Sequence, residues 1–256
     1  MSFEAELKLA VAAAQAAGTV LRAHFGTPYR VIRKSPREMV TEIDLKAQTA
    51  ILEVLAPSGL GVETEERRLG PVQEGLRWIV DPLDGTHNYI AGLPFSGVSI
   101  ALADETHFEV GVILFPMEDR LYTAVRGGGS FLNGAAIQVS ANQDISRTLV
   151  TYDNQFHLHP RSLHWFERLT RAAFTTRIFG TATNDLTLTA SGRVDGRIFV
   201  NTKICDIAAG MVILTEAGGR VTDFSGRSCG LDARQVIASN GGIHEALLRI
   251  VSEEEA

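Results

Sequence analysis

The most informative segment of this chain is Asp81-Pro82-Leu83-Asp84-Gly85-Thr86-His87-Asn88-Tyr89. It follows the apolar run 78–80, which predicts a buried strand, so two carboxylates leave a strand end together. Pro82 lacks an N–H and should end the strand, Gly85 permits a tight turn, and Thr86 is expected to cap the next helix. The segment therefore predicts acidic oxygens beside free backbone N–H groups, which suits a phosphate ester bridged to hard divalent cations.

The composition agrees with a metal site of this kind. With 256 residues, 45% of them apolar and 21% charged, the chain suits one large globular domain or two closely packed halves. A net charge of −6 and the lack of a Lys and Arg cluster argue against nucleic-acid binding. An acidic protein that handles an anionic ester needs metal cations at its site.

The remaining bulk features point to the cytoplasm. Two cysteines, Cys205 and Cys229, make no disulfide framework, which indicates a reducing compartment. The N-terminus has no basic region followed by a long apolar segment, and instead predicts an amphipathic helix that ends near Gly26. No apolar run approaches the roughly 18 residues of a membrane span, so we expect no membrane contact.

Two patterns of secondary structure succeed each other along the chain. The first half predicts a strand at 31–36 that runs into a loop, a helix from Thr41 to Leu55 with Leu45 on its inner side, and an antiparallel meander over 96–140. The second half alternates strands with helices at 164–173, 182–191 and 207–217. The change near residue 145 predicts two parts, 1–145 and 146–256, which share one cleft without a linker.

The nine-residue segment resembles the signature of the inositol monophosphatase family, which is Asp-Pro-(Ile/Leu)-Asp-Gly-Thr-x-Asn-(Phe/Tyr). The resemblance extends in order from Lys34 to the C-terminal helix. It implies an α/β fold, the layered αβαβα sandwich of the sugar-phosphatase type, with helices on an antiparallel sheet in the N-terminal half and an α/β C-terminal half. It also implies a Mg²⁺-dependent, lithium-sensitive phosphomonoester phosphatase, a small phosphorylated substrate and a homodimer.

The resemblance assigns two metal positions. Glu65, Asp81 and the Leu83 carbonyl correspond to the first, with Glu66 as the alternative if the register is off by one. Asp81, Asp84 and Asp206 correspond to the second, and a third, weaker Mg²⁺ near Glu65 is common in the family. The family has tryptophan before the last aspartate, where this chain has Cys205; the sequence itself also predicts Asp206 as a helix N-cap.

Other positions of the site are expected to bind water and substrate. Asp44 lies three residues after Thr41, a spacing typical of a capping box, and the resemblance pairs it with Thr86 to orient the attacking water. The expected substrate contacts are the N–H groups of Gly85 and Thr86, the segment Gly180-Thr181-Ala182, and Lys203. Lys34 and Lys203 could equally be solvated surface charges, and Gly180-Thr181-Ala182 could be an ordinary helix start.

The substrate is not fixed by these motifs. Inositol-preferring relatives carry a glutamate seven residues before the last aspartate, where this chain has Phe199, so inositol 1-phosphate should be a poor substrate that Phe199→Glu improves. Phe199 could stack on a base or lie in the core. Histidinol phosphate, fructose 1,6-bisphosphate, a 3′-phosphoadenosine nucleotide and NADP are alternatives, as is a regulatory member that binds other proteins. The pair His157 and His159 is interpreted as a polar loop.

Overall fold

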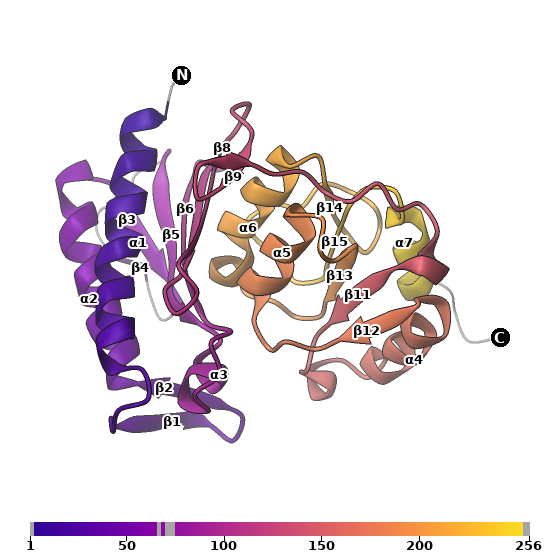
Figure 1. The fold of residues 1–256 in the computed structure, drawn as a ribbon, viewed down its shortest axis with the longest axis horizontal. Helices are drawn as coiled ribbons and strands as arrows, with labels where there is room; N and C mark the ends of the chain where they lie inside the picture. Colours follow the sequence, from indigo (N-terminus) through magenta and orange to yellow (C-terminus); the bar gives the residue numbers. More distant parts are fainter. Residues whose placement is uncertain (1–2, 66–67, 70–74, 253–256) are drawn as a thin grey trace.

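The computed structural model describes residues 3–65, 68–69 and 75–252, which form five alternating layers of helix and sheet (Figure 1). The helices are α1 (Glu4–His24), α2 (Glu42–Leu55), α3 (Thr86–Ile90), α4 (Ser162–Ala172), α5 (Ala182–Ala190), α6 (Ile204–Glu216) and α7 (His244–Ser252). Helices α1 and α2 form one outer layer, α5 and α6 the central layer, and α4 and α7 the other outer layer. The expected αβαβα sandwich is confirmed.

The first sheet separates α1 and α2 from the central helices. Its order is β10-β9-β8-β7-β6-β5-β3-β4, and most neighbouring strands are antiparallel. Its strands are β3 (Gly61–Thr64), β4 (Arg68–Leu69), β5 (Arg77–Asp84), β6 (Gly97–Ala103), β7 (Phe108–Phe115), β8 (Arg120–Val125), β9 (Ser130–Leu132) and β10 (Ala135–Ala136). Side chains alternate across β5: Trp78 and Val80 pack toward α1 and α2, whereas Ile79 packs toward α6.

The second sheet lies between the central helices and the pair α4 and α7. Its order is β12-β11-β13-β15-β14, with parallel pairs around β11 and antiparallel pairs around β15. The strands are β11 (Leu149–Tyr152), β12 (Thr175–Arg177), β13 (Gly196–Phe199), β14 (Arg220–Asp223) and β15 (Val236–Ser239). The first sheet thus comes from residues 61–136 and the second from 149–239. The division of the chain at residue 145 stays a prediction.

The central layer depends on close helix packing. A Cβ at Gly210 would lie 2.4 Å from Leu186 Cδ1, and a Cβ at Gly111 would lie 2.4 Å from the Ala209 carbonyl oxygen. Glycine is therefore required where α6 meets α5 on one side and β7 on the other. This packing fixes the start of α6, which carries Asp206, against the sheet that carries Asp81.

Two local predictions were wrong in the N-terminal half. Residues 31–41 form a hairpin of β1 (Val31–Ser35) and β2 (Glu38–Thr41), where a strand followed by a loop was expected. In α2 the buried face consists of Ile43, Ala47, Ile51 and Leu55, at helical spacing, so Leu45 points to solvent with 47% of its surface exposed.

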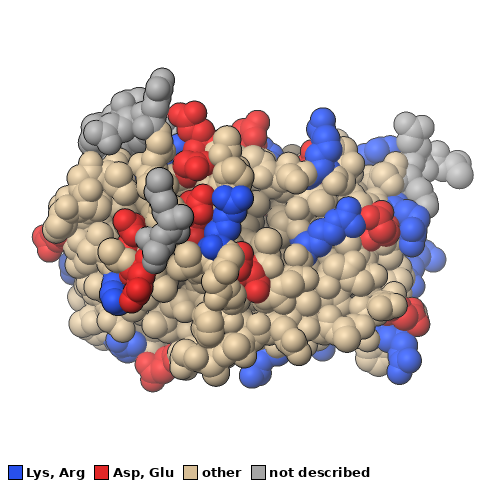
Figure 2. Space-filling view, turned by 90° about the horizontal axis from the view of Figure 1, so that it is seen from above, with Lys and Arg blue, Asp and Glu red and all other residues tan. Residues whose placement is uncertain are grey.

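Positive and negative side chains are interspersed on the face seen in Figure 2, with no continuous area of one sign among the coloured residues. Several charges of the described residues form short-range ion pairs, such as Arg220 with Glu245 at 2.6 Å. Among the helices that the structure describes, none is both long and apolar enough to cross a bilayer.

Candidate active site

The predicted metal ligands meet in one cleft of about 670 Å³ between the two halves of the chain. Hairpin β1–β2 and the segment after β11, which contains the short helix η3 (Phe156–Leu158), also line it. The predicted site residues that line the cleft are Glu65, Asp81, Leu83, Asp84, Gly85, Thr86, Gly180, Lys203 and Asp206. Asp44, Thr181 and Ala182 do not line it.

Asp81 and Asp206 form the negatively charged centre of the cleft. The alternation along β5 places Asp81 on the face covered by α6, and only 6% of its surface is exposed. Burial, followed by the charges of Asp206 and Asp84, raises the pKa of Asp81 well above its ordinary value. Burial and the charge of Asp84 raise the pKa of Asp206 to about 7. In the described part of the chain no lysine or arginine forms an ion pair with either carboxylate, so this donor set suits divalent cations.

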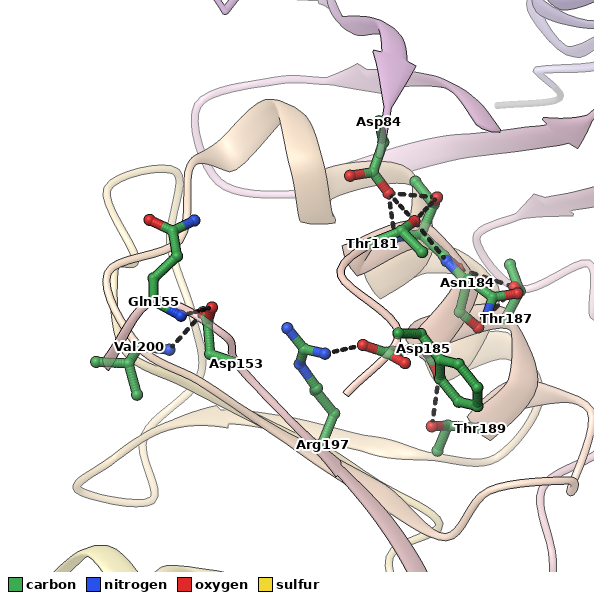
Figure 3. Close-up of polar contacts among 12 residues, drawn as sticks. Asp84, Asp153, Gln155, Thr181, Asn184, Asp185, Thr187, Thr189, Arg197 and Val200 are labelled. Atoms are coloured by element: carbon green, nitrogen blue, oxygen red, sulfur yellow. Dashed lines mark hydrogen bonds and ion pairs between the residues drawn. The ribbon is translucent and has the colours of Figure 1, made fainter. Parts of the chain in front are cut away.

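Asp84 is held by the first turn of α5 (Figure 3). Its Oδ2 accepts hydrogen bonds from the Thr181 hydroxyl, from the Thr183 hydroxyl at 2.5 Å and from the Thr183 N–H at 2.8 Å. Three donors on one oxygen fix the rotamer of the carboxylate and leave Oδ1 for another ligand. Thr181 thus serves Asp84 and the N-cap of α5, rather than lining the cleft as expected.

Helix α5 also carries one partner of a buried ion pair (Figure 3). Asp185 in α5 is fully buried and forms an ion pair with Arg197 of β13, which is 4% exposed. The guanidinium also lies 4.5 Å from the centre of the Phe199 ring. The pair joins the helix that holds Asp84 to the second sheet.

The turn after β5 differs from the prediction in two details. The ladder with β6 is interrupted after Asp81 and resumes at Asp84, so Pro82 causes an irregularity and does not end the strand. Gly85, at φ +80°, is the N-cap of α3, and a Cβ there would lie 2.7 Å from the Phe95 carbonyl oxygen. Thr86 is therefore the first helical residue, and its hydroxyl is available for other contacts.

The Thr86 hydroxyl connects the cleft to Asp44. Its Oγ1 lies 3.1 Å from Asp44 Oδ1 and 3.0 Å from the Leu83 carbonyl oxygen. Asp44 Oδ2 accepts from the N–H and hydroxyl of Thr41, which completes the expected capping box. Burial raises the pKa of Asp44, while its hydrogen bonds with Thr41 and Thr86 oppose that shift. Asp44 therefore has both of the contacts that the sequence suggested, one at the cap and one to Thr86.

Glu65 and Lys203 contact each other. Lys203 Nζ lies 2.7 Å from Glu65 Oε1 and 2.7 Å from Glu38 Oε1, and Lys34 Nζ lies 3.6 Å from Glu65 Oε2. A metal ion at Glu65 would therefore compete with two ammonium groups. The alternative ligand, Glu66, lies outside the described residues.

Two predictions about the C-terminal half need correction. The N-cap of α6 is Lys203, so Asp206 lies inside the first turn and does not cap the helix. Phe199 is 1% exposed, packs in the core between the sheets and does not line the cleft. Of its two possible roles, core packing is the observed one, and a glutamate at 199 would lie beside Arg197 rather than reach a substrate.

Sequence reasoning missed the part of the cleft wall formed by Arg37, Glu38 and His157. The signal was the polar run after Lys34, which a hairpin turn brings to the cleft. The two histidines have different contacts: His159 stacks on Trp165 at 4.5 Å between ring centres, whereas His157 contacts Arg37.

Asp104, His107 and Glu109 have ligand atoms within 4.8 Å of one another, away from the cleft. Asp104 Oδ1 already accepts from the N–H groups of Thr106 and His107 and from the Thr106 hydroxyl. These bonds close the β6–β7 turn, and Glu109 forms an ion pair with Arg126, so the cluster is less suited to a cation than Asp81 and Asp206.

Comparison with known proteins agrees with the fold and the cleft. The sequence profile described as the inositol monophosphatase family matches residues 4–256. An inositol-1-monophosphatase of Mesorhizobium japonicum is 36% identical over 99% of this chain and 98% of its own length. The Nus factor SuhB of Pasteurella multocida is 35% identical over 94% of each chain. The crystal structure of the suppressor protein suhB from Bartonella henselae has a TM-score of 0.94 at 34% identity, over 98% of this chain and 100% of that one.

The fold and the acidic cleft are those of a metal-dependent phosphoric monoester hydrolase, which acts on small phosphorylated substrates. The chain belongs to the inositol monophosphatase family.

Proposed function

We propose that this protein is a Mg²⁺-dependent phosphomonoester phosphatase whose catalysis takes place at Asp81 and Asp206. The observation that carries the proposal is a pair of carboxylates, Asp81 buried and Asp206 half-buried, with raised pKa values and no ion pair to a lysine or arginine in the described residues. Such a site costs folding free energy unless cations fill it, which indicates that it is retained for function.

The ligands divide between two positions. Glu65, Asp81 and the Leu83 carbonyl would hold one ion, and Asp81, Asp84 and Asp206 the other. When bound, two Mg²⁺ ions supply an activated water and neutralise the charge that develops on the leaving oxygen. The three donors on Asp84 Oδ2 support this assignment, because they direct Oδ1 away from the threonines.

Thr86 and Asp44 would orient the attacking water. A water that donates to Thr86 Oγ1 is held in place when the threonine donates its own hydrogen to Asp44 Oδ1, 3.1 Å away. The donors of Thr41 favour the charged form of Asp44 and oppose the rise in its pKa that burial causes. The N–H groups of Gly85 and Thr86 would bind phosphoryl oxygens, and Gly180 would contact the organic part, since these residues line the cleft.

The direct test is hydrolysis of a panel of phosphate esters with and without Mg²⁺. The panel contains inositol 1-phosphate, histidinol phosphate, fructose 1,6-bisphosphate, a 3′-phosphoadenosine nucleotide and NADP. We expect Mg²⁺-dependent release of phosphate from at least one ester. No turnover of any of them at any Mg²⁺ concentration would overturn the proposal.

Four further properties are part of the proposal. Lithium should inhibit at high Mg²⁺ by occupying the second metal position in the product complex, which a dose series at constant ionic strength tests. The protein should be a cytoplasmic homodimer that binds no nucleic acid; light scattering gives the oligomeric state.

A regulatory role is the second candidate, because the relative from Pasteurella multocida is called a Nus factor. The retained carboxylates of the cleft favour catalysis, since a protein that only binds other proteins does not need them. If a regulatory partner exists, Asp81→Asn should abolish hydrolysis and leave the interaction intact.

A further inference from the structure

Arg37 and His157 form a pair of contacting side chains in the wall of the cleft. Arg37 lies in the turn between β1 and β2, and His157 lies in η3. Arg37 Nη1 lies 3.2 Å from His157 Nδ1, and both residues line the same cleft as the carboxylates. Because a guanidinium only donates, His157 Nδ1 accepts and its ring proton is on Nε2.

Arg37 differs from the lysines in and near the cleft. Lys203 and Lys34 both form ion pairs with Glu65, and Lys203 pairs with Glu38 as well. Among residues 3–65 and 75–252, no carboxylate forms an ion pair with Arg37. Its side chain is hydrogen-bonded to the His157 ring, and no acidic group of the described residues compensates its positive charge in an ion pair.

We propose that Arg37 and His157 form an anion-binding subsite that selects phosphate esters whose organic part carries a second anionic group. The inference rests on the proposed phosphatase function. It adds that the part of the substrate that does not react is negatively charged. A second phosphate and a carboxylate both meet this requirement, because each is an anion that accepts hydrogen bonds from a guanidinium.

Three features support an anion at this position. The guanidinium keeps most of its five donors and the imidazole keeps its Nε2–H, so the pair offers donors and no acceptor. Planar guanidinium groups bind carboxylate and phosphate in a bidentate manner. The amides of Gln155 and Asn201 line the same cleft, and its volume of about 670 Å³ exceeds what a phosphate group alone occupies.

The test compares esters that differ in one anionic group. Glycerol 2-phosphate and 2-phosphoglycerate differ by a carboxylate, and glucose 1-phosphate and glucose 1,6-bisphosphate differ by a phosphate. We expect kcat/KM to be about 10 to 100 times higher for the more anionic member of at least one pair, as for one charge-assisted contact. The pair that responds identifies which anion the subsite prefers.

Arg37→Met should remove this preference, mainly by raising KM, because the subsite contacts the part of the substrate that does not react. Arg37→Lys should retain part of it. Arg33→Met is the matched control, since Arg33 is exposed on the same hairpin and does not line the cleft; it should keep the full preference. The inference is wrong if the wild type hydrolyses both members of each pair equally, or if the preference survives Arg37→Met. Absence of any hydrolysis would instead overturn the phosphatase proposal.

Discussion

Helix α5 lies beside two groups of buried or half-buried charged side chains, and the two groups differ in how their charge is compensated. At its N-terminal end Asp84 joins Asp81 and Asp206; burial, followed by the charges of the neighbouring carboxylates, raises the pKa values of Asp81 and Asp206. One turn later, Asp185 pairs with Arg197 in an apolar setting. The first group leaves its charge uncompensated at a cleft, whereas the second compensates its charge inside the core. Uncompensated charge indicates a ligand site, and compensated charge indicates a structural link.

The largest effect is expected for Asp81→Asn. We expect activity to fall by about 10³-fold or more, because losing several kcal/mol of metal-dependent transition-state stabilisation has that effect. The same substitution should raise the melting temperature of the chelated protein, since it removes a buried like charge.

Activity assays and thermal melts in chelator measure both effects. Asp104→Asn is the control, because Asp104 belongs to the acidic cluster outside the cleft and should leave the Mg²⁺ dependence unchanged. Loss of Mg²⁺-dependent activity in the control instead of in Asp81→Asn would move the metal site to the β6–β7 turn.

Asp185→Asn, in contrast, should destabilise the folded protein. It leaves Arg197 buried without its carboxylate, so the free energy of unfolding should fall by about 3–5 kcal/mol. Urea denaturation measures it. Glu167→Gln removes one partner of the exposed pair with Arg171 and should cost less than about 1 kcal/mol. Equal losses in the two variants would show that burial does not distinguish the pairs.

Loss of the hydrogen bond between Thr86 and Asp44 should have a smaller effect, which is confined to kcat. Thr86→Ala and Asp44→Asn should each lower kcat by about 10²-fold with little change in KM, because they orient water in the transition state. Their double variant should lose much less than the product of the single losses if the two act together. Additive losses would restrict Asp44 to capping α2.

The sequence predicted the parts of the site that depend on local spacing. The interval of three residues between Thr41 and Asp44 gave the capping box, and the nine-residue segment gave the turn that carries Asp84 and Thr86. Family resemblance brought Asp206 to the same cleft. These features are local or follow a shared motif, so pattern alone was enough.

The features that the sequence did not predict depend on contacts between elements that are far apart in the chain. The pair Asp185 and Arg197 joins α5 to β13, and no local pattern indicates it. Arg197 and Phe199 share one face of β13 by alternation, which places Phe199 in the core. The contact between Arg37 and His157 spans 120 residues and depends on a hairpin that the sequence did not predict.

Metal-free protein should lose stability as pH rises. The pKa of Asp206 is about 7 in the folded protein against an ordinary value of 3.8, so the folded state binds more protons between these values. Its contribution to stability is therefore fully present below about pH 4 and is lost as pH rises toward 7. Melting of wild type and Asp206→Asn in chelator across this range measures the effect. The melting temperature of the variant should increase relative to that of the wild type as pH rises. An equal pH dependence of the two melting temperatures would contradict the raised pKa of Asp206.

The smallest effect is expected for Lys203, whose ion pairs lie at the cleft but are partly exposed. It pairs with Glu38 and Glu65 at the partly exposed edge of the cleft, so Lys203→Met should change the free energy of unfolding by less than about 1 kcal/mol. If Glu65 is a metal ligand, removing a competing ammonium group should lower the Mg²⁺ concentration needed for half-maximal activity. A Mg²⁺ titration of wild type and variant at saturating substrate measures the shift. A higher Mg²⁺ requirement in the variant would mean that Lys203 holds Glu65 in its binding position rather than competing for it.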